Sequence, residues 1–578
     1  MARPAGALKN DAINAVTRKQ YKNHVMKQDF KTGSLPPANV SPLAEALSRP
    51  QPKEKLSPCC NGCATGQDVR GWIAVVAQRG KLGLSEAEAN TRAWRMVTEV
   101  NPFPATLGRI CPHPCESSCS RGEKDGSVAI NDLERFLGDW ALEQRLSLLK
   151  LEQETQPESI GVIGAGPAGL SFAYQMARRN YRVTVYEKQE KPGGMLYYGI
   201  PQFRLPEEVL NAEVQRILDL GVELKLNVSI GNDISLQDLR KQHDILFLGI
   251  GAGHGRNLGV KGEEGTNVWS GTDYLQSLNR GKPHELGSEV IVVGGGNTAV
   301  DAARVARRSG ARVTMLYRRT RNEMPAIASE IDEALAEGVS IEYLVTPVEI
   351  KRDHGAVRTM VVQRMELGKP DSSGRCRPVP VPDSEYELPA DSVIAAVSQE
   401  PDWDALPELD PGTVWVQPAG HGKFQDDLWA GGDALGLSIA GIAIAQGRQA
   451  AEEVHARLRG LEPPCASQQP AVSKITIKAD YYPAIKPVTP HQKSVEERLA
   501  EPDTEVRDTI THAEFLEEVS RCFSCGLCYG CENCFMYCNA GGFTRLVQVE
   551  PGAYFALSRE YCVGCGKCID LCPSGFLT

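Results

Sequence analysis

Ten of the eighteen cysteines lie within the last 57 residues, and their spacing restricts what this part of the chain can fold around. Two runs share the pattern C-x-x-C-x-x-C-x-x-x-C. Closely spaced thiols of this kind are typical ligands of iron–sulfur clusters, because iron in such clusters prefers soft sulfur donors. A zinc site or a set of disulfides would not require a paired repeat of this spacing. The runs are Cys528-Cys531-Cys534-Cys538 and Cys562-Cys565-Cys568-Cys572.

The paired runs predict two 4Fe-4S clusters in an α+β, bacterial-type two-cluster ferredoxin domain. In such domains the fourth cysteine of each run crosses to the other cluster. Two details depart from the usual pattern. Asn539 stands where the first run often has proline, and Cys522 and Cys525 precede that run and could replace two of its ligands. The assignment within the first run therefore stays open.

The chain as a whole has 578 residues, enough for about three or four domains. Its net charge of −10 argues against a nucleic-acid partner, and no apolar run approaches the length of a membrane span. Sixteen of the eighteen cysteines fall in two groups with metal-ligand spacing, and Cys376 and Cys465 are interpreted as incidental. Together with the absence of a secretory signal, this pattern predicts a protein of the reducing cytoplasm.

Residues 159–187 have the pattern of a βαβ unit that binds a dinucleotide. An apolar strand leads into a glycine turn, a helix and a second strand that ends at Glu187. The first glycine allows the tight turn, the second allows a pyrophosphate to approach, and the third allows helix and strand to pack. Glu187 is placed to accept hydrogen bonds from ribose hydroxyls. The turn comprises Gly164, Gly166, Pro167, Ala168 and Gly169.

The same pattern recurs after the strand at residues 289–293, with a different end to its second strand. Arg318 and Arg319 follow this strand where the first unit has a carboxylate, and Arg321 lies close behind. Guanidinium groups bind a 2′-phosphate that a carboxylate would repel, so the pattern favours NADP(H) over NAD(H). The turn contains Gly294, Gly296, Asn297, Thr298 and Ala299.

A third signal follows the strand at residues 428–430, where Gly432 and Asp433 precede an Ala-, Gly- and Gln-rich helix. Alone, the aspartate could be a helix cap. After two dinucleotide turns, it is interpreted as the far wall of an FAD site, with the helix N-terminus facing the pyrophosphate.

These motifs together resemble the glutamate synthase small-subunit family, which includes the N-terminal half of dihydropyrimidine dehydrogenase and the large subunit of NADH-dependent ferredoxin:NADP oxidoreductases. The resemblance covers about residues 59–460. It implies FAD on the first turn, NAD(P)H on the second and a helical iron–sulfur domain in front. It also implies that a segment at residues 193–201 lies along the flavin. Further cofactor-binding residues on this reading are Lys188, Gly194, Met195, Leu196 and Arg204.

The front domain of this family normally binds two 4Fe-4S clusters with the help of an upstream C-x-x-C pair, which this chain does not show before Cys59. By position, the resemblance matches Cys63, Cys111, Cys115 and Glu134 to one complete ligand set. Cys59, Cys60 and Cys119 then remain, either for an unusually ligated second cluster or as unused thiols. We expect one complete cluster here and leave the second open.

The sequence therefore predicts an α/β multidomain flavin and iron–sulfur oxidoreductase with two nested Rossmann-like domains. No catalytic side chain is assigned, because nicotinamide, flavin and clusters carry the chemistry. The only cysteine between Gly281 and Pro389 is Cys376, which excludes a thioredoxin-reductase-like dithiol. The expected boundaries are an extension at 1–55, the helical iron–sulfur domain at 56–155, the FAD domain at 156–285 and 388–460, the NAD(P)H domain at 286–387, a linker at 461–510 and the ferredoxin domain at 511–578.

The chain lacks a substrate-transforming domain, so we expect an electron-transfer subunit whose partners are other oxidoreductase subunits or a ferredoxin. By analogy, a 2-oxoacid:acceptor oxidoreductase is the preferred partner. The alternatives are a free-standing NAD(P)H:ferredoxin oxidoreductase, a glutamate synthase small subunit and a wiring subunit without turnover.

Overall fold

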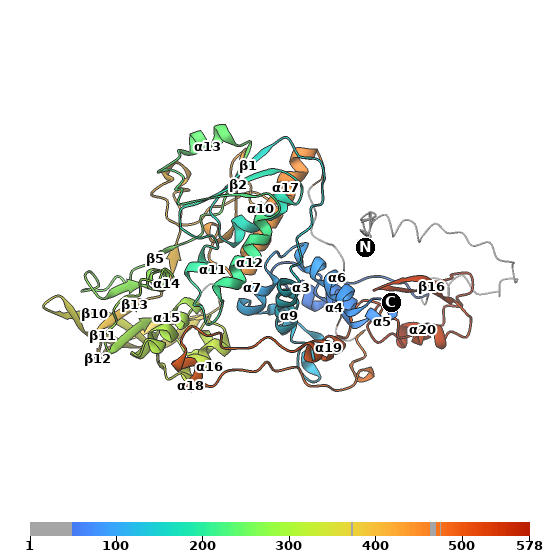
Figure 1. The fold of residues 1–578 in the computed structure, drawn as a ribbon. Helices are drawn as coiled ribbons and strands as arrows, with labels where there is room; N and C mark the ends of the chain where they lie inside the picture. Colours follow the sequence, from blue (N-terminus) through green and yellow to red (C-terminus); the bar gives the residue numbers. More distant parts are fainter. Residues whose placement is uncertain (1–48, 371–373, 463–469, 474–475) are drawn as a thin grey trace, which may run out of the picture.

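A computed structural model describes residues 49–578 except 371–373, 463–469 and 474–475. The chain begins there with a helical domain in the middle of the molecule (Figure 1). Its helices start at recognisable caps: Ser85 and Glu88 form a reciprocal capping box at the start of α6. The helices are α3 (Pro58–Gly62), α4 (Val69–Ala77), α5 (Arg79–Leu82), α6 (Glu86–Thr98), α7 (Pro104–Ile110), α8 (Pro114–Ser117) and α9 (Ile130–Glu143).

The first Rossmann-like domain contains a five-stranded parallel sheet with the order β15-β4-β1-β2-β3. Helix α10 packs on α17 and on this sheet, which places the first glycine turn at the carboxyl end of β1. The elements are β1 (Ser159–Ile163), α10 (Pro167–Ala177), β2 (Arg182–Glu187), α11 (Met195–Tyr198), α12 (Glu207–Leu218), β3 (Glu223–Leu226), α13 (Leu236–Gln242), β4 (Ile245–Leu248), β15 (Leu428–Ala430) and α17 (Ala440–Arg459).

The second Rossmann-like domain has a parallel sheet with the order β6-β13-β7-β8-β9, beside an antiparallel sheet of β10-β11-β12. A short β5–β14 ladder connects the two domains. The elements are β5 (His254–Gly255), β6 (Val268–Ser270), α14 (Gly271–Asn279), β7 (Glu289–Val293), α15 (Asn297–Arg308), β8 (Arg312–Tyr317), α16 (Ala328–Ala336), β9 (Ser340–Tyr343), β10 (Val345–Asp353), β11 (Ala356–Pro370), β12 (Cys376–Pro389), β13 (Ser392–Ala395) and β14 (Gln399–Glu400).

The expected boundaries of this domain, 286–387, are too narrow. Strand β6 precedes them and β13 follows them, yet β13 pairs with both β6 and β7 in the second sheet. Both strands are short, three and four residues, so neither has a length or periodicity that would assign it to one sheet from sequence. The second domain therefore includes one strand before the predicted range, β6, and one strand after it, β13.

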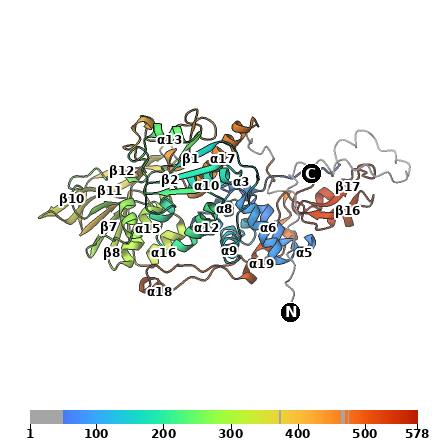
Figure 2. The same cartoon turned by 45° about the horizontal axis from the view of Figure 1, so that its top comes forward.

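The segment expected to be a linker is a strap that runs along the molecule to the second domain and returns (Figures 1 and 2). Its two arms pair between Gln492 and Arg507, and α18 lies at the far end. Val506 N donates to Phe203 O at 3.1 Å, so the strap is anchored on the Rossmann-like domains. It contains α18 (Val495–Ala500) and leads to α19 (His512–Ser520), which packs on α4 and α9.

The C-terminal domain projects from the opposite end of the molecule, beside the helical domain (Figure 1). An antiparallel hairpin faces two short helices. Gln51 N donates to Thr578 O at 2.7 Å, so the described part of the expected N-terminal extension pairs with the chain's own C-terminus, and residues 1–48 lie outside the described residues. The elements are α20 (Asn533–Met536), β16 (Phe543–Glu550), β17 (Ala553–Leu557) and α21 (Lys567–Asp570).

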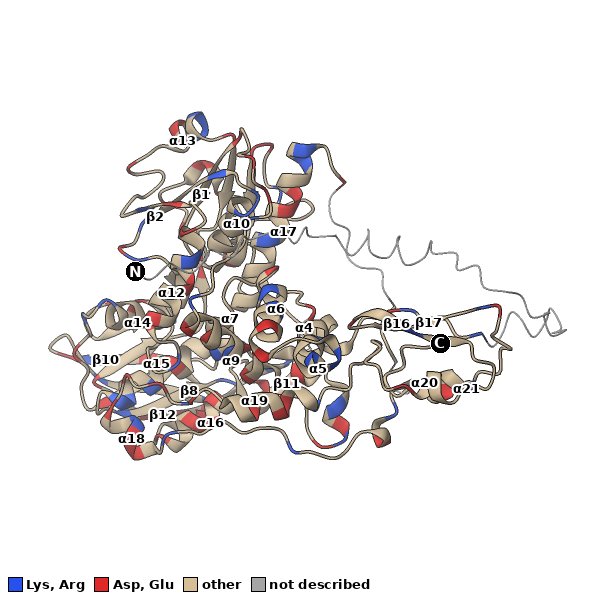
Figure 3. Cartoon of the chain, turned by 45° about the vertical axis from the view of Figure 1, so that its right-hand side comes forward, with Lys and Arg blue, Asp and Glu red and all other residues tan. Residues whose placement is uncertain are grey.

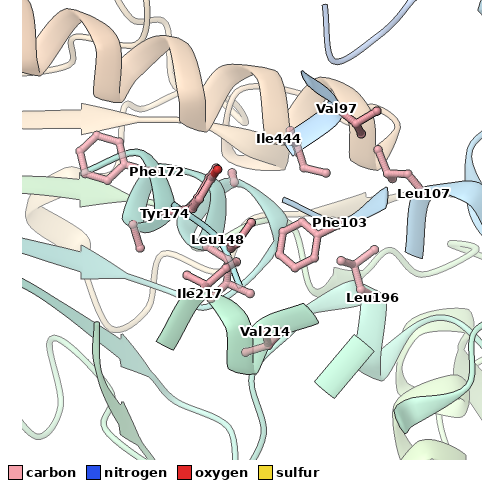
Figure 4. Close-up of a cluster of buried hydrophobic side chains, with 14 of the residues drawn as sticks. Val97, Phe103, Leu107, Leu148, Phe172, Tyr174, Leu196, Val214, Ile217 and Ile444 are labelled. Atoms are coloured by element: carbon pink, nitrogen blue, oxygen red, sulfur yellow. The ribbon is translucent and has the colours of Figure 1, made fainter. Parts of the chain in front are cut away.

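One buried core joins the helical domain to the first Rossmann-like domain (Figure 4). Glu213 of α12 reinforces this junction, because its carboxylate accepts from Ala105 N at 2.8 Å and Thr106 N at 2.9 Å at the start of α7. Burial raises the pKa of Glu213 to about 7 despite these hydrogen bonds. The core includes Val97, Phe103, Leu107, Phe172, Tyr174, Val214, Ile217 and Ile444.

Charged residues of both signs lie close together in the region of α15, α16 and α18 (Figure 3). Arg304 is fully buried there, and its guanidinium lies 2.8 Å from both Glu333 and Glu337. Arg308 also pairs with Glu337 at 2.7 Å and donates to Pro502 O of the strap at 2.8 Å. This network fixes the strap to the second domain.

Candidate functional site: two dinucleotide cavities and a series of thiol groups

The first cavity, of about 420 Å³, opens at the carboxyl ends of β1 and β2. Gly194 has φ +55°, and a Cβ there would lie 2.9 Å from Gly166 Cα, so a glycine at 194 is needed for this close approach of two chain segments. Ten predicted residues line the cavity: Gly164, Gly166, Pro167, Ala168, Glu187, Lys188, Gly194, Met195, Gly432 and Asp433.

The two carboxylates of this cavity are held differently. Glu187 accepts from Ala165 N at 2.7 Å and Gln189 N at 2.9 Å, so backbone amides orient it toward the cavity. Asp433 accepts from Ser438 N at 3.1 Å, and burial raises its pKa to about 6. A carboxylate held beside a glycine turn can accept a hydrogen bond from a hydroxyl group of a bound dinucleotide.

Three residues predicted for this site lie outside the cavity lining. Gly169 serves packing instead, because a Cβ there would lie 2.0 Å from Gly164 O. Leu196 belongs to the buried core. Arg204 forms an ion pair with Asp301, with atoms 2.7 Å apart, and connects the two Rossmann-like domains.

The sequence motifs did not indicate the segments that close the cavity, which are loops with Asn232, Ala405 and Leu406 and the short strand β5 with His254.

The second cavity, of about 470 Å³, lies over the second glycine turn. The predicted Gly294, Gly296, Thr298, Arg318 and Arg319 line it. Arg318 is exposed, whereas Arg319 is buried and donates through Nε to Cys376 O at 2.8 Å.

Two further predicted residues support the turn from outside the cavity: Asn297 accepts from Ile327 N at 2.9 Å, and Ala299 is fully buried. Arg375, on the loop between β11 and β12, also lines the cavity and was not foreseen from sequence. Arg321 instead pairs with Asp332 at 2.5 Å.

The two cavities meet at the start of α14. Thr272 lines the second cavity and its neighbour Asp273 lines the first. The short ladder between β5 and β14 lies at the same junction, since His254 lines the first cavity and Gln399 the second. Two ligands bound to the two glycine turns can therefore approach each other here.

A small cavity in the helical domain contains the predicted ligand set Cys63, Cys111, Cys115 and Glu134. Glu134 is buried and accepts from Gln67 Nε2 at 2.7 Å and Asn101 Nδ2 at 2.8 Å. Burial raises its pKa to about 7, against the effect of these two hydrogen bonds.

This small cavity lies close to the first dinucleotide cavity. A Cβ on Gly441 would lie 3.1 Å from Ala64 Cβ, next to Cys63, and Ala443 of the same helix lines the first dinucleotide cavity.

The C-terminal domain brings together Cys528, Cys531 and Cys534 of its first run and Cys572 of the second around one cavity. This is the crossed arrangement that the spacing predicts. The remaining thiols lie on the outer side, where Gly542 N donates to Cys538 Sγ at 3.3 Å and a Cβ on Gly542 would lie 3.8 Å from Cys562 Cα. Cys565 and Cys568 belong to the same run as Cys562, and Cys565 is exposed. These four remaining cysteines are called the outer thiol group.

Cys59 and Cys119 line a separate cavity that they share with Cys522 and Cys525, whereas Cys60 lines neither cavity of the helical domain. Among the described residues, no group of three or more His, Cys, Asp or Glu side chains is arranged to hold a metal ion. The thiols instead surround cavities, which suits a cluster whose several irons each take a different ligand.

Three family models match this chain. Pyridine nucleotide-disulphide oxidoreductase matches residues 158–447, the dihydropyrimidine dehydrogenase domain II with a 4Fe-4S cluster matches 52–146, and a 4Fe-4S binding domain matches 556–578. The fold and these matches define a flavin-, pyridine-nucleotide- and 4Fe-4S-dependent oxidoreductase, as the sequence predicted.

The glutamate synthase [NADPH] small chain of Escherichia coli is 32% identical over 444 residues, which cover 72% of this chain and 92% of that protein. The chain belongs to the glutamate synthase small-chain family.

Two longer relatives are more similar in sequence. The NADP(+)-dependent formate dehydrogenase subunit beta of Moorella thermoacetica is 38% identical, covering 73% of this chain and 62% of that protein. The NADPH-Fe(3+) oxidoreductase subunit beta of Geobacter sulfurreducens is 37% identical, covering 66% and 56%. The chain thus spans less than two thirds of these relatives.

Among solved structures, FprA of Mycobacterium tuberculosis in complex with NADPH is similar with a TM-score of 0.47 and 18% identity, over 64% of this chain and 100% of that one. In the described part of the chain, no helix has both the length and the apolar character needed to cross a membrane.

Proposed function

We propose that this chain is the NADP(H)-linked electron-transfer subunit of a larger oxidoreductase. The observation that carries the proposal is the junction of the two dinucleotide cavities at Thr272 and Asp273, with thiol groups beginning beside the first cavity. Bound FAD would exchange a hydride with the nicotinamide and single electrons with the clusters. The chain's own residues orient the two nucleotides and place the thiols beside the flavin.

The arginines of the second cavity support NADP(H) over NAD(H). Arg318 and Arg375 are exposed and line the cavity, where a 2′-phosphate would be neutralised by guanidinium groups. The three relatives compared above have NADP or NADPH in their names, in agreement with this reading.

The C-terminal domain supports the presence of a redox partner. Its outer thiol group is surrounded by exposed apolar side chains at the end of the molecule, and exposed apolar surface around a redox centre suits contact with another protein. These side chains are Met536, Tyr537, Tyr561 and Val563. The names of the three relatives refer to formate dehydrogenase, Fe(3+) oxidoreductase and glutamate synthase. The proposal therefore specifies the partner only as a redox protein or subunit. A 2-oxoacid:acceptor oxidoreductase is one such partner to test.

The experiment is anaerobic reduction of the purified full chain by NADPH and by NADH, followed by isolation of its native complex. The proposal expects flavin reduction that is faster at low NADPH than at the same NADH concentration, and a companion redox subunit. Failure of both nucleotides to reduce the flavin would leave the wiring subunit, and a catalytically complete chain without a companion would indicate a free-standing NAD(P)H:ferredoxin oxidoreductase. A companion that oxidises a 2-oxoacid would support the finer assignment.

A further inference from the structure

Four thiols from opposite ends of the sequence line one cavity between the helical domain and the C-terminal segment. Cys59 and Cys119 belong to the helical domain, and Cys522 and Cys525 belong to the segment that follows α19. Among the described residues that line this cavity none is a carboxylate, and the charged ones are Arg70 and Arg121. The donor set is soft and anionic when deprotonated, and the two cations lie beside it, which suits iron better than a hard metal ion.

The neighbouring Cys60 does not line this cavity. Ser57 Oγ donates to its sulfur at 2.9 Å and lies 3.1 Å from Cys59 Sγ, so both sulfurs contact the same hydroxyl. The Cys60 thiol also lies 3.5 Å from Asp68 Oδ1. The cavity lining therefore distinguishes two adjacent cysteines that the sequence alone could not distinguish.

Buried arginines hold the C-terminal segment against the front domain. Arg70 donates to Cys525 O at 2.8 Å, and Arg121 donates to Arg521 O. Arg521 in turn donates to Ser127 O at 2.9 Å and to Gly126 O at 2.7 Å. All three guanidinium groups are almost fully buried, and buried charge is tolerated where it is hydrogen-bonded. The two halves of the thiol group thus meet through specific hydrogen bonds from arginines to backbone carbonyls.

The backbone between Cys522 and Cys525 has the same kind of turn as the ferredoxin run. Ser524, the second residue between Cys522 and Cys525, has φ +51°, and Gly530, at the same place between Cys528 and Cys531, has φ +68°. Non-glycine residues rarely adopt this conformation, so its recurrence points to a shared requirement of the turn. Ser524 N also donates to Cys522 Sγ at 3.4 Å, a contact of the kind that tunes iron–sulfur clusters.

We propose that Cys59, Cys119, Cys522 and Cys525 ligate a fourth 4Fe-4S cluster, so that the C-terminal segment completes a cluster of the front domain. The pair Cys522-x-x-Cys525 takes the place of the C-x-x-C pair that is missing before Cys59. This leaves both ferredoxin runs with their full sets of four cysteines. The proposed fourth cluster does not depend on which nucleotide or partner the chain uses.

The proposal makes the clusters consecutive along the molecule. Cys525 and Cys528 are three residues apart, so their Cα atoms are at most about 11 Å apart, and these two ligands serve adjacent clusters. On the other side, Cys59 and Cys63 are separated by four residues, at most about 14 Å. The shared cluster thereby connects the ferredoxin domain to the cluster beside the flavin.

The test compares two paired variants of the full chain, Cys59→Ser/Cys119→Ser and Cys522→Ser/Cys525→Ser, with the variant that combines all four changes. Iron and acid-labile sulfide are measured per FAD after anaerobic purification. The expected values are about sixteen irons for the unchanged chain and about twelve for each pair, since one 4Fe-4S cluster is lost. The combined variant is also expected to keep about twelve, because both pairs serve the same cluster. Cys60→Ser is the matched control and keeps about sixteen.

A combined variant with about eight irons would overturn the proposal, because the pairs would then serve different clusters. A Cys522→Ser/Cys525→Ser variant that keeps sixteen would overturn it too. A second measurement covers variants that fold poorly: Cys119→Asp and Cys522→Asp retain a potential ligand, and electron paramagnetic resonance of the reduced protein then reports which signal changes. The proposal expects both to alter the same signal, and changes in two different signals would contradict it. Neither readout changes if the nucleotide assignment fails.

Discussion

Replacement of Arg318 by glutamine tests the nucleotide assignment at a single side chain. Arg318 is exposed and lines the second cavity, whereas Arg319 is buried with its Nε bonded to Cys376 O at 2.8 Å. Arg318 is therefore the side chain able to turn toward a 2′-phosphate without breaking a buried contact. A hydrogen bond to a charged group contributes about 1.5–3 kcal/mol, and each 1.4 kcal/mol is about tenfold in affinity. We expect NADPH to bind about 10- to 150-fold more weakly.

The assay is stopped-flow reduction of the flavin over a range of NADPH and NADH concentrations, which yields an apparent Kd for each. NADH lacks the 2′-phosphate, so its Kd should change less than about threefold. The NADPH effect should also shrink as salt is added, because the site is exposed. Arg321→Gln is the matched control: this arginine pairs with Asp332 at 2.5 Å and lies outside the cavity lining. Equal weakening of both nucleotides by Arg318→Gln, or no change in either, would refute the reasoning.

Three further changes test other parts of the molecule. Gly194→Ala should abolish FAD retention, measured as FAD per chain, because its Cβ would lie 2.9 Å from Gly166 Cα at a φ of +55°; full FAD occupancy would contradict this. Glu134→Ala should cost about four irons per FAD, whereas Glu134→Gln should keep them, since an amide oxygen can still reach the cluster; an unchanged iron content in Glu134→Ala would remove it from the ligand set. Arg304→Leu should destabilise the second domain by about 3–5 kcal/mol in chemical denaturation, because it leaves buried carboxylates without a cation. Arg312→Ala, at an exposed ion pair with Glu289, should cost less than about 1 kcal/mol, and equal losses would contradict the difference in burial.

Local motifs predicted much of the architecture because each is a short-range requirement of the backbone. The two glycine turns follow β1 and β7 as expected, since a tight turn between strand and helix needs particular residues at fixed offsets. The crossed group of Cys528 and Cys572 likewise follows from repeat spacing. Family membership, fold class and cofactors were predicted correctly on the same basis.

Features that depend on distant parts of the chain were not predictable from sequence. Arg204 was predicted to bind a cofactor, and its ion pair with Asp301 on another domain could not be anticipated from the sequence. The strap was expected to be a simple linker, and its anchoring depends on packing against buried charges of α15 and α16. Cys59 and Cys522 meet only because α19 packs on the helical domain. No local pattern encodes such contacts.

The central claim is that one chain carries electrons between NADP(H) and its clusters through the flavin. The most direct measurement is an anaerobic titration of the full chain with NADPH, followed by optical absorbance and electron paramagnetic resonance. The account predicts reduction of the flavin together with signals of reduced 4Fe-4S clusters, at lower concentrations of NADPH than of NADH. The account would be contradicted if the flavin is reduced while every cluster stays oxidised, although a reductant poised at the potential of NADPH reduces the clusters.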